Sequence, residues 1–302
     1  MGAQQLALVT VTHNSSAELA VLLASAETHL AGAQVVVVDC ASRDRSAAVA
    51  HSHPGVEVVA LEENVGFGRG CNRGLQEVGT PVTALVNPDV ELLDDSLDTL
   101  AGEALRTDRP ARLLAPLVLC DDGSRQDTAH PAPCSAADLA RALIPPGIAP
   151  GAAGVALAPW RSRVPRRVGW AVGCALVART ETLRRLGPFD EAIFMYGEDM
   201  DLGLRAAAAG VQTWFWPAAR VRHHRAHSSL RAFGGEPFER QARARHDVVA
   251  RRLGRRHAAV DDAAQALTFA SRLVIKQALG RPADREPRQL AALRSMRAPR
   301  VP

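Results

Sequence analysis

Three acidic side chains, Glu198, Asp199 and Asp201, fall at the predicted start of a helix and are the first candidates for chemistry. The macrodipole favours acids at a helix start, which gives some of them an ordinary structural explanation. Asp201 and Arg205 are spaced i, i+4 and can pair on the helix surface, and Glu198 can act through capping. Asp199 points about 100° away from Glu198 on the same turn. It is therefore the acid most free to face a substrate.

A cluster of imidazoles, His223, His224 and His227, is the second candidate. The i, i+4 spacing of His223 and His227 is found in zinc sites, but no cysteine or further acid stands at zinc-site spacing around them. We therefore do not expect a closed structural zinc site. Asp89 closes the tripeptide 87–89 (Asn-Pro-Asp) after an apolar run, where a carboxylate could hold a divalent cation together with the diphosphate of a bound nucleotide.

The tripeptide at 87–89 is also good turn chemistry, so taken alone it predicts a turn. One histidine that completes a metal site at Asp89 is the more economical interpretation, and the sequence leaves open which of the three reaches the metal. The glycine-rich segment 66–70 permits two interpretations with equal weight. It is either a dinucleotide-binding fingerprint, although it follows the third predicted strand instead of the first, or a tight strand-to-helix turn.

Alternating strand and helix patterns must position these residues. Short apolar, β-rich runs predict strands at 6–12, 35–39, 56–61 and 82–86. Helical patterns at 16–30, 44–51 and 68–78 separate them, and this order predicts a parallel sheet with helices on both faces. Polar residues follow every one of these strands, and the carboxyl ends of parallel strands line the crevice where ligands bind. The residues concerned are Thr12, His13, Asn14, Asp39, Asn64, Asn87 and Asp89.

The second half of the chain has a different pattern. We expect strands at 113–119, 170–177 and 211–216, a turn at 121–123 with a returning arm at 124–128, and helices at 180–186 and 199–209. Residues 131–165 are rich in Pro, Ala and Gly with little periodicity, which predicts a loop or insertion. The tail reads as two or three basic helices broken near Gly254 and at 280–282.

Composition narrows the class of protein. The net charge of +4 is uneven, because residues 239–302 hold 15 Lys and Arg against 6 Asp and Glu. Phe269 is the one aromatic in that tail, so we expect no nucleic-acid binding, and an anionic membrane surface or a lipid-linked acceptor is the favoured partner of the tail. A solvated charged face is the alternative. Five widely spaced cysteines, no long apolar stretch and no signal-peptide pattern predict a soluble cytoplasmic protein, peripheral on the inner face of the membrane if the tail docks there.

Six stretches in register resemble the inverting family 2 glycosyltransferases of the GT-A fold, in particular the bacterial rhamnosyltransferase-like branch. They are VTVTHN at 9–14, VVDCASRD at 37–44, NVGFG at 64–68 with Asn72, LVNPD at 85–89, GPFDE at 187–191 and YGEDMDL at 196–202. The resemblance covers roughly residues 6–230. It implies an α/β fold with a mostly parallel, Rossmann-like sheet flanked by helices. The implied organisation is a domain at 1–235, with a nucleotide-binding half at 1–110 and an acceptor half at 111–235, followed by a basic helical extension at 236–302.

The resemblance also assigns roles residue by residue. Asp39 resembles the acid that binds the pyrimidine base, and the other predicted nucleotide-sugar contacts are Thr12, His13, Asn14, Asn64, Gly66, Asn72, Asn87 and Asp89. Asp89 and His223 are the implied ligands of Mg²⁺ or Mn²⁺, and Asp199 is the implied catalytic base. Trp170, Gly173, Cys174 and Glu198 are expected beside the acceptor and donor sugar. The implied reaction is a direct displacement at the anomeric carbon without a covalent enzyme intermediate.

Three positions depart from the family pattern. Asn87 stands where many relatives have an acid, Cys40 replaces a common Asn, and Gly169 precedes Trp170 where an acid is frequent. The leading prediction is transfer of rhamnose from dTDP-rhamnose to a lipid-linked or polysaccharide acceptor in cell-envelope glycan synthesis. Transfer from a UDP-hexose such as galactose or N-acetylglucosamine is the rival within the class, and a non-catalytic nucleotide-sugar-binding subunit is the rival outside it. The sequence leaves the oligomeric state open.

Overall fold

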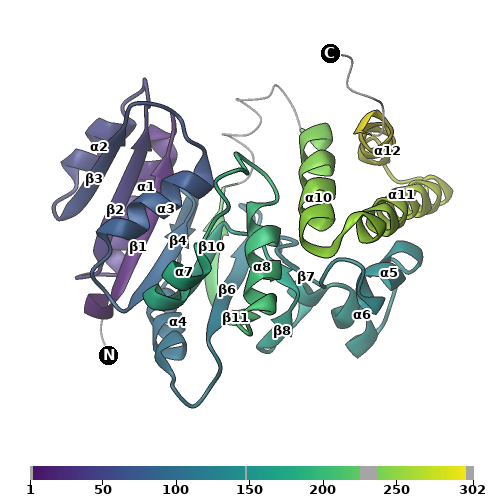
Figure 1. The fold of residues 1–302 in the computed structure, drawn as a ribbon, viewed down its shortest axis with the longest axis horizontal. Helices are drawn as coiled ribbons and strands as arrows, with labels where there is room; N and C mark the ends of the chain where they lie inside the picture. Colours follow the sequence, from purple (N-terminus) through teal and green to yellow (C-terminus); the bar gives the residue numbers. More distant parts are fainter. Residues whose placement is uncertain (1–2, 147, 225–236, 297–302) are drawn as a thin grey trace.

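The computed structural model describes residues 3–146, 148–224 and 237–296. Its first half alternates strands and helices in the predicted order, as Figure 1 shows. These elements are η1 (Ala3–Gln5), β1 (Leu6–Thr12), α1 (Ser16–His29), β2 (Gln34–Cys40), α2 (Ser46–Ser52), β3 (Val56–Leu61), α3 (Phe67–Glu77) and β4 (Val82–Val86). Every residue of β1 and β4 is buried, which explains why both runs consist of apolar residues and threonine.

The second half adds shorter strands and more helices. They are β5 (Val90–Leu92), α4 (Ser96–Leu105), β6 (Arg112–Leu119), β7 (Ala129–His130), α5 (Ala136–Leu143), α6 (Gly151–Leu157), η2 (Pro159–Arg161), β8 (Arg166–Val168), β9 (Trp170–Ala171), β10 (Ala175–Arg179), α7 (Thr180–Leu186), α8 (Glu198–Ala208) and β11 (Gln212–His223). In β11 buried and less buried residues alternate, as expected for a strand with one face on the core.

In the described part of the chain the strands form one mixed sheet of nine, in the order β3-β2-β1-β4-β10-β6-β11-β5, with β8 paired to β11. Strands β1 to β4 are parallel, whereas β10 runs antiparallel to both β4 and β6. Strands β7 and β9 pair separately. The predicted α/β fold with a mostly parallel central sheet is confirmed. Because β1, β2 and β4 are neighbours and parallel, their carboxyl ends meet at one edge.

Helices cover both faces of this sheet. On one face α1 and α4 pack against it through a core that includes Leu22, Leu97 and Leu100, and α2 joins α1 at the margin. On the other face α3, α7 and α8 contribute Leu75, Leu183 and Leu202. These two apolar layers on either side of β1, β4 and β10 hold the loops at the carboxyl ends in place.

Two glycines let α3 approach the sheet closely. A Cβ at Gly70 would lie 2.6 Å from Val11 Cγ1, and one at Gly74 would lie 2.6 Å from Val9 Cγ1. Gly66, before the helix, has φ +82°, which a side chain rarely adopts. The glycines of segment 66–70 therefore serve a tight turn and close helix–sheet packing, which is the second of the two predicted interpretations.

Residues 131–165 do not form the predicted loop, because they contain α5, α6 and η2. The Ser135 hydroxyl accepts a hydrogen bond from the Asp138 N–H and caps α5. The buried Asp138 carboxylate lies 3.6 Å from Arg245 of helix α10 (Phe238–Leu253), a partner more than a hundred residues away. Local patterning missed these helices because alanines give little apolar periodicity and the stabilising contacts are distant in sequence.

Two further expectations are corrected by the structure. The predicted strand 170–177 is divided into β9 and β10, which belong to different sheets, and Gly173 lies at the break. The predicted returning arm 124–128 pairs with β6 through a single bridge between Leu119 and Arg125 instead of a strand.

The basic tail forms α10 (Phe238–Leu253), α11 (Arg255–Ala278) and α12 (Arg285–Met296), with breaks at the predicted positions. Figure 1 shows these helices beyond α8, on the side away from β1 to β3. Helix α10 packs on α8 through an apolar cluster that includes Ile193, Met200, Val248 and Val249. No helix in the three described stretches is both long and apolar enough to traverse a lipid bilayer.

Candidate functional site

The carboxyl ends of β1 and β2 present a buried threonine and a buried carboxylate side by side. Thr12 and Asp39 are register partners in the parallel ladder, and Asp39 is 5% exposed. Its Oδ2 accepts a hydrogen bond from the Ser42 N–H at 3.3 Å, whereas its buried Oδ1 has no partner among the described residues. An unused acceptor at the crevice is suited to an N–H of a bound ligand, because a buried polar atom without a partner costs free energy.

The loop after β1 is held rigid by short hydrogen bonds. His13 Nδ1 lies 2.6 Å from the Cys40 carbonyl oxygen, so Nδ1 carries the proton, and the Asn14 amide lies 3.0 Å from the other ring nitrogen. Asn14, at φ +54°, also accepts from the Arg43 N–H at 2.7 Å. The structure therefore brings Thr12, His13, Asn14 and Asp39 together, and their contacts with a nucleotide stay predictions.

Asn64 and Asn72 both bind backbone groups of their own protein. The Asn64 Oδ1 accepts from the Gly66 N–H at 3.0 Å and shapes the turn into α3. The Asn72 amide donates to the Phe189 carbonyl at 2.9 Å and accepts from the Phe189 N–H at 3.1 Å. This two-bond contact fixes segment 187–191 against α3. Both side chains thus position backbone segments, and their role in nucleotide binding stays a prediction.

Asp89 and His223 form one corner of the crevice. Asp89 is 7% exposed, and its Oδ1 lies 3.1 Å from His223 Nε2. His223 Nδ1 lies 3.1 Å from the Gln126 side-chain oxygen, and the Gln126 amide donates to the His223 carbonyl at 3.0 Å. Gln126 therefore contacts His223 at two points, and these contacts orient the ring with Nε2 toward Asp89.

These residues fit a divalent cation shared with a ligand. A histidine that ligates a metal usually donates its other N–H to an oxygen, which is the contact that Gln126 offers. Asp89 and His223 supply two ligands, and within the described ranges no group of three His, Cys, Asp or Glu could hold a metal ion. Mg²⁺ keeps several positions for water and substrate phosphates, so two protein ligands suit an ion held with a diphosphate.

The other predicted histidines differ from His223. His224 Nδ1 lies 2.6 Å from Asp121 Oδ1, and its backbone N–H donates to the Asp89 carbonyl at 2.9 Å. Its ring thus faces two other acids, Asp121 and Glu91. His227 lies outside the described residues. Of the two described candidates, His223 is the one whose ring contacts Asp89.

A run of backbone contacts connects this corner to the acidic end of α8. The Asn87 N–H donates to the Cys174 carbonyl at 2.9 Å, and the Gly173 N–H donates to Asp199 Oδ2 at 3.2 Å. Burial raises the pKa of the Cys174 thiol to about 12, and the charges of Asp89 and Asp199 act in the same direction. The backbone at 173–174 therefore links Asp199 to the turn that carries Asp89, although the two acids are 110 positions apart in the chain.

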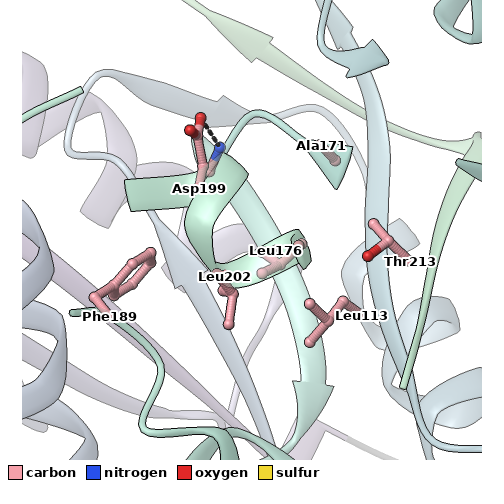
Figure 2. A pocket seen from close by; sticks show the side chains of 9 residues that line it. Leu113, Ala171, Leu176, Phe189, Asp199, Leu202 and Thr213 are labelled. Atoms are coloured by element: carbon pink, nitrogen blue, oxygen red, sulfur yellow. Dashed lines mark hydrogen bonds between the residues drawn. The ribbon is translucent and has the colours of Figure 1, made fainter. Parts of the chain in front are cut away.

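Asp199 is held by two backbone donors and a tight contact. Its Oδ1 accepts from its neighbour Met200 N–H at 2.7 Å, while a Cβ at Gly173 would lie 3.4 Å from its own Cβ. Burial raises the pKa of Asp199 above its usual range, and the two backbone donors oppose that shift. Figure 2 shows Asp199 above a small apolar cavity of about 10 Å³, enough for at most one water. The cavity is a packing gap, and a sugar would not fit it.

Glu198 adjoins Asp199 and differs from it electrostatically. Its Oε2 is buried and has no hydrogen-bond partner in the described part of the chain. It makes no side-chain cap, contrary to the capping interpretation. Burial, followed by the charge of Asp199, raises the pKa of Glu198 to about 8. One carboxyl of the pair is thus protonated at neutral pH, which leaves the charge on its neighbour.

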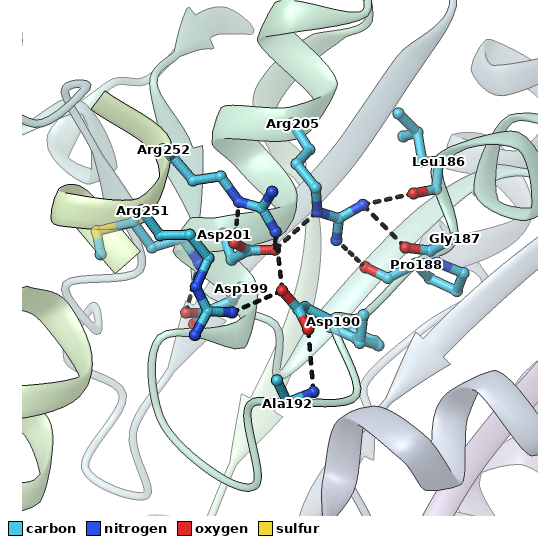
Figure 3. A network of polar contacts seen from close by, with 12 residues as sticks. Leu186, Gly187, Pro188, Asp190, Ala192, Asp199, Asp201, Arg205, Arg251 and Arg252 are labelled. Carbon is cyan, nitrogen blue, oxygen red and sulfur yellow. Dashed lines mark hydrogen bonds and ion pairs between the residues drawn. The ribbon is translucent and has the colours of Figure 1, made fainter. Parts of the chain in front are cut away.

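Asp201 belongs to a buried ionic network instead of the crevice (Figure 3). The side chain is 0% exposed and accepts from Arg205 at 2.7 Å and from Arg252 of α10 at 2.6 Å. Arg252 also reaches Asp190 at 2.9 Å, and Arg251 reaches the same oxygen at 2.7 Å. The network ties the start of α8 and the loop at Asp190 to the C-terminal helices. The predicted i, i+4 pair is therefore present, with a partner that the sequence did not indicate.

Trp170 packs against α8 at Gly203. Its ring stacks on His130 with centroids 4.2 Å apart, and a Cβ at Gly203 would meet its Cβ at 2.6 Å. Gly169 tolerates no side chain, because its Cβ would lie 2.0 Å from the Ala132 nitrogen. The absence of an acid before Trp170 thus has a steric reason. Sequence reasoning missed Gln126, His130 and Arg252, since none of them belongs to a local motif.

The fold, with polar residues gathered at the carboxyl ends of β1, β2 and β4, is that of the GT-A class. Two solved structures of this class align over 97% of this chain. The mannosyltransferase PcManGT from Pyrobaculum calidifontis, with GDP-Man and Mn²⁺, has a TM-score of 0.61 at 15% identity and is covered to 85%. TarS 1–349 of S. aureus, with UDP-GlcNAc, has a TM-score of 0.58 at 13% identity and is covered to 80%. They confirm the predicted fold.

Sequence comparison gives the family. The model described as Glycosyl transferase family 2 matches residues 7–112. The N-acetylglucosaminyl-diphospho-decaprenol L-rhamnosyltransferase of Mycobacterium tuberculosis is 30% identical over 247 residues, an alignment that covers 75% of this chain and 78% of that protein. The chain belongs to glycosyl transferase family 2, as its motifs predicted.

Proposed function

We propose that this chain is a metal-dependent, inverting hexosyltransferase of cell-envelope glycan synthesis that transfers rhamnose from dTDP-rhamnose to a hydroxyl of a lipid-linked or polysaccharide acceptor. The name of the Mycobacterium tuberculosis relative, N-acetylglucosaminyl-diphospho-decaprenol L-rhamnosyltransferase, supports rhamnose as the transferred sugar and a lipid-linked acceptor. A peripheral position on the inner face of the membrane and an oligomeric state are further expectations, and the proposal does not depend on them.

One observation carries the assignment of roles. Residues 173 and 174 connect the two acids, because the Gly173 N–H donates to Asp199 Oδ2 and the Cys174 carbonyl accepts from the Asn87 N–H, two positions before Asp89. A pocket bounded by a cation-holding carboxylate on one side and a proton-accepting carboxylate on the other is what a displacement reaction requires. The buried, unpartnered Oδ1 of Asp39 supports a nucleoside at the far end of the same crevice.

In this proposal Asp199 Oδ accepts the proton of the acceptor hydroxyl as that oxygen bonds to the anomeric carbon. The bond between the anomeric carbon and the diphosphate oxygen breaks, and its electron pair leaves with the nucleoside diphosphate, so the configuration inverts. Asp89 and His223 would hold Mg²⁺ or Mn²⁺, which neutralises charge on the departing diphosphate when bound. Backbone donors from Gly173 and Met200 keep the Asp199 carboxylate oriented.

A donor panel with and without chelator tests the proposal. Purified protein is supplied with dTDP-rhamnose, UDP-galactose or UDP-N-acetylglucosamine and a lipid-linked acceptor, and nucleoside diphosphate release and product configuration are measured. We expect dTDP release from dTDP-rhamnose, inversion, and loss of activity in EDTA that Mn²⁺ restores. Release of UDP would favour the UDP-hexose transferase. Tight nucleotide-sugar binding without release from any donor would favour a non-catalytic subunit.

A further inference from the structure

A cationic groove lies outside the crevice, between the C-terminal helix α11 and the segment that holds α5, α6 and η2. It encloses about 520 Å³, which is within the usual range for a ligand pocket. Figure 1 shows α11 directly above α5, and the Ser271 hydroxyl donates to the Ala142 carbonyl at 3.0 Å. The two walls of the groove, α5 and α11, are therefore in contact, although they are more than a hundred residues apart in the chain.

The groove carries more positive charge than its surroundings neutralise. Arg141, Arg161, Arg272 and Lys276 line it, with Asp127 as the one acid of the lining. Lys276 is paired with Glu286 at 2.5 Å. By contrast, no salt bridge joins Arg141 or Arg272 to a described carboxylate, and both are half-buried. Burial, and then the charge of Arg141, lowers the pKa of Arg272, whereas the charges of Asp127 and Glu286 oppose that shift. Two adjacent guanidinium groups without an ion-pair partner favour a bound anion.

Three exposed aliphatic side chains adjoin lining residues of this groove in the sequence. Leu143 and Ile144 directly precede two prolines of the lining and are 65% and 44% exposed. Val274, which precedes lining residue Ile275, is 64% exposed. Exposed aliphatic side chains beside unpaired arginines fit a membrane surface, whose head groups can be anionic and whose interior is apolar.

We propose that this groove binds the phosphate head group of an anionic membrane lipid, with Leu143 and Ile144 entering the apolar part of the bilayer. Charge complementarity selects this occupant, since a phosphate on an acyl chain satisfies both the arginines and the exposed aliphatic side chains. The proposal replaces a diffuse attraction of the whole basic tail by one docking site, and it assigns a membrane-facing role to segment 131–165. It is independent of the donor sugar and of the transfer reaction.

Vesicle flotation of the full chain tests the charge of the site. We compare vesicles of phosphatidylcholine alone with vesicles that also contain phosphatidylglycerol, for the wild type and the double variant Arg141→Gln/Arg272→Gln. The partition coefficient onto anionic vesicles should fall roughly 25-fold in the variant, from about fivefold for each charge removed. Wild type should not float with neutral vesicles.

A matched control removes two arginines from α11, the helix that carries Arg272. Arg255→Gln/Arg256→Gln deletes the same charge at the start of α11, about 25 Å from Arg272 along the helix and beyond the screening length of roughly 10 Å at 0.1 M salt. This variant should bind anionic vesicles within about twofold of wild type. Equal loss in both variants would overturn the proposal, because it would reveal a general field of the basic tail. Equal binding of wild type to both vesicle types would overturn it as well.

A second arm keeps the proposal testable if the arginine variant unfolds, which a thermal melt would reveal. Leu143→Ser should weaken vesicle binding by roughly tenfold, the effect of withdrawing one aliphatic side chain from the bilayer. Val260→Ser, at a 48% exposed position of α11, should leave vesicle binding unchanged. Calorimetric binding of inorganic pyrophosphate without vesicle binding would overturn the membrane source. Normal vesicle binding by the groove variants with impaired transfer to a detergent-solubilised lipid acceptor would instead assign the groove to the acceptor.

Discussion

At the scale of single residues, Asp199 combines a raised pKa with a fixed orientation. Burial raises the pKa of its carboxyl, while the Gly173 and Met200 N–H groups hold its two oxygens. A general base works best when its pKa is close to the operating pH, so a raised value suits proton removal from a hydroxyl. The same backbone contacts prevent the carboxylate from turning away between turnovers.

Asp199→Asn should lower turnover by roughly 10² or more and leave donor binding nearly unchanged, because the amide keeps the shape but cannot accept a proton. Steady-state kinetics and calorimetric titration with dTDP-rhamnose measure the two effects. Glu198→Gln is the control, since Glu198 is already neutral at pH 7 and its amide mimics that form. A larger loss of turnover in Glu198→Gln than in Asp199→Asn would show that Glu198, and not Asp199, is the catalytic base.

The raised pKa of Glu198 makes the stability of the protein depend on pH. Its carboxyl ionises near 8 in the folded chain but near 4.5 when unfolded, so the folded state binds more protons between these values. Stability must then fall as pH rises through this window, by at most about 1.4 kcal/mol per pH unit from this group. Glu198→Gln should flatten the decline, as thermal melts from pH 5 to 8 would show. An identical decline in the variant would disprove the assignment.

Gln126 is a positioning residue, because it contacts His223 at the ring nitrogen Nδ1 and at the backbone carbonyl. Gln126→Leu keeps the bulk and removes both contacts, and should weaken Mn²⁺ binding in the presence of dTDP by about 10- to 100-fold. Electron paramagnetic resonance of bound Mn²⁺ provides a readout apart from activity. Gln126→Glu retains an oxygen toward His223 Nδ1 and should recover most of the affinity. Unchanged Mn²⁺ binding in the Leu variant would exclude this role.

At the scale of elements, helix α8 owes its position to helix α10. The Asp201 carboxylate is fully buried, and Arg252 compensates its charge together with Arg205 (Figure 3). Directly before α8, Gly197 has φ +83°, and its position lies against Val248 of α10, 3.2 Å from where a Cβ would stand. Two consecutive arginines at the end of α10 thus fix the turn from which Glu198 and Asp199 emerge.

Arg252→Ala should reduce the free energy of unfolding by about 3–5 kcal/mol, because it leaves a buried carboxylate short of a partner. Arg251→Ala is a matched control one position away, since its side chain is 41% exposed and its pair with Asp190 should contribute about 0–1 kcal/mol. Urea unfolding of both variants measures the difference. Similar losses in the two variants would show that burial of Asp201 does not govern the energetics of this contact.

At the scale of the whole molecule, the C-terminal helices act as a wall of the catalytic half. Met200 of α8 and Ile193 pack against Val248 and Val249 of α10. A bidentate pair at 2.7 Å from Arg245 to the buried Asp261 then ties α10 to α11. The boundary that the sequence suggested near residue 235 is thus crossed by an apolar cluster and by buried ion pairs. We propose that the C-terminal helices α10 to α12 fold with the catalytic half instead of forming a separate domain.

Ending the chain at Gly235 should therefore expose Ile193 and Met200, uncover the Asp201 charge and lower both the melting temperature and the turnover. Calorimetry of the full chain should show one cooperative transition, since the contacts across residue 235 are those of a core. Two separate transitions in the full chain, with the first 235 residues melting as they do alone, would contradict this. Donor binding by the shortened chain reports whether the nucleotide half survives.

The strand and helix order of the first ninety residues was predictable because each element carries its own signal. Buried parallel strands such as β1 and β4 are apolar apart from their threonines, and the polar residues after them mark the strand ends. Asp39, Asp89 and Asp199 could likewise be singled out, since each belongs to a local motif. The helices in 131–165 and the break at Gly173 escaped prediction, because alanine-rich helices and close backbone contacts leave little periodic trace.

By itself the sequence determined the α/β class, the family and the candidate acids, because local periodicity and short motifs are written in consecutive residues. Only the tertiary structure decided which histidine contacts Asp89, which arginine neutralises Asp201 and which groove keeps unpaired arginines. His223, Gln126 and Arg252 lie in segments far apart in the chain, and their contacts depend on how the sheet and the C-terminal helices pack. Pairing between distant segments follows from that packing, and no local pattern encodes it.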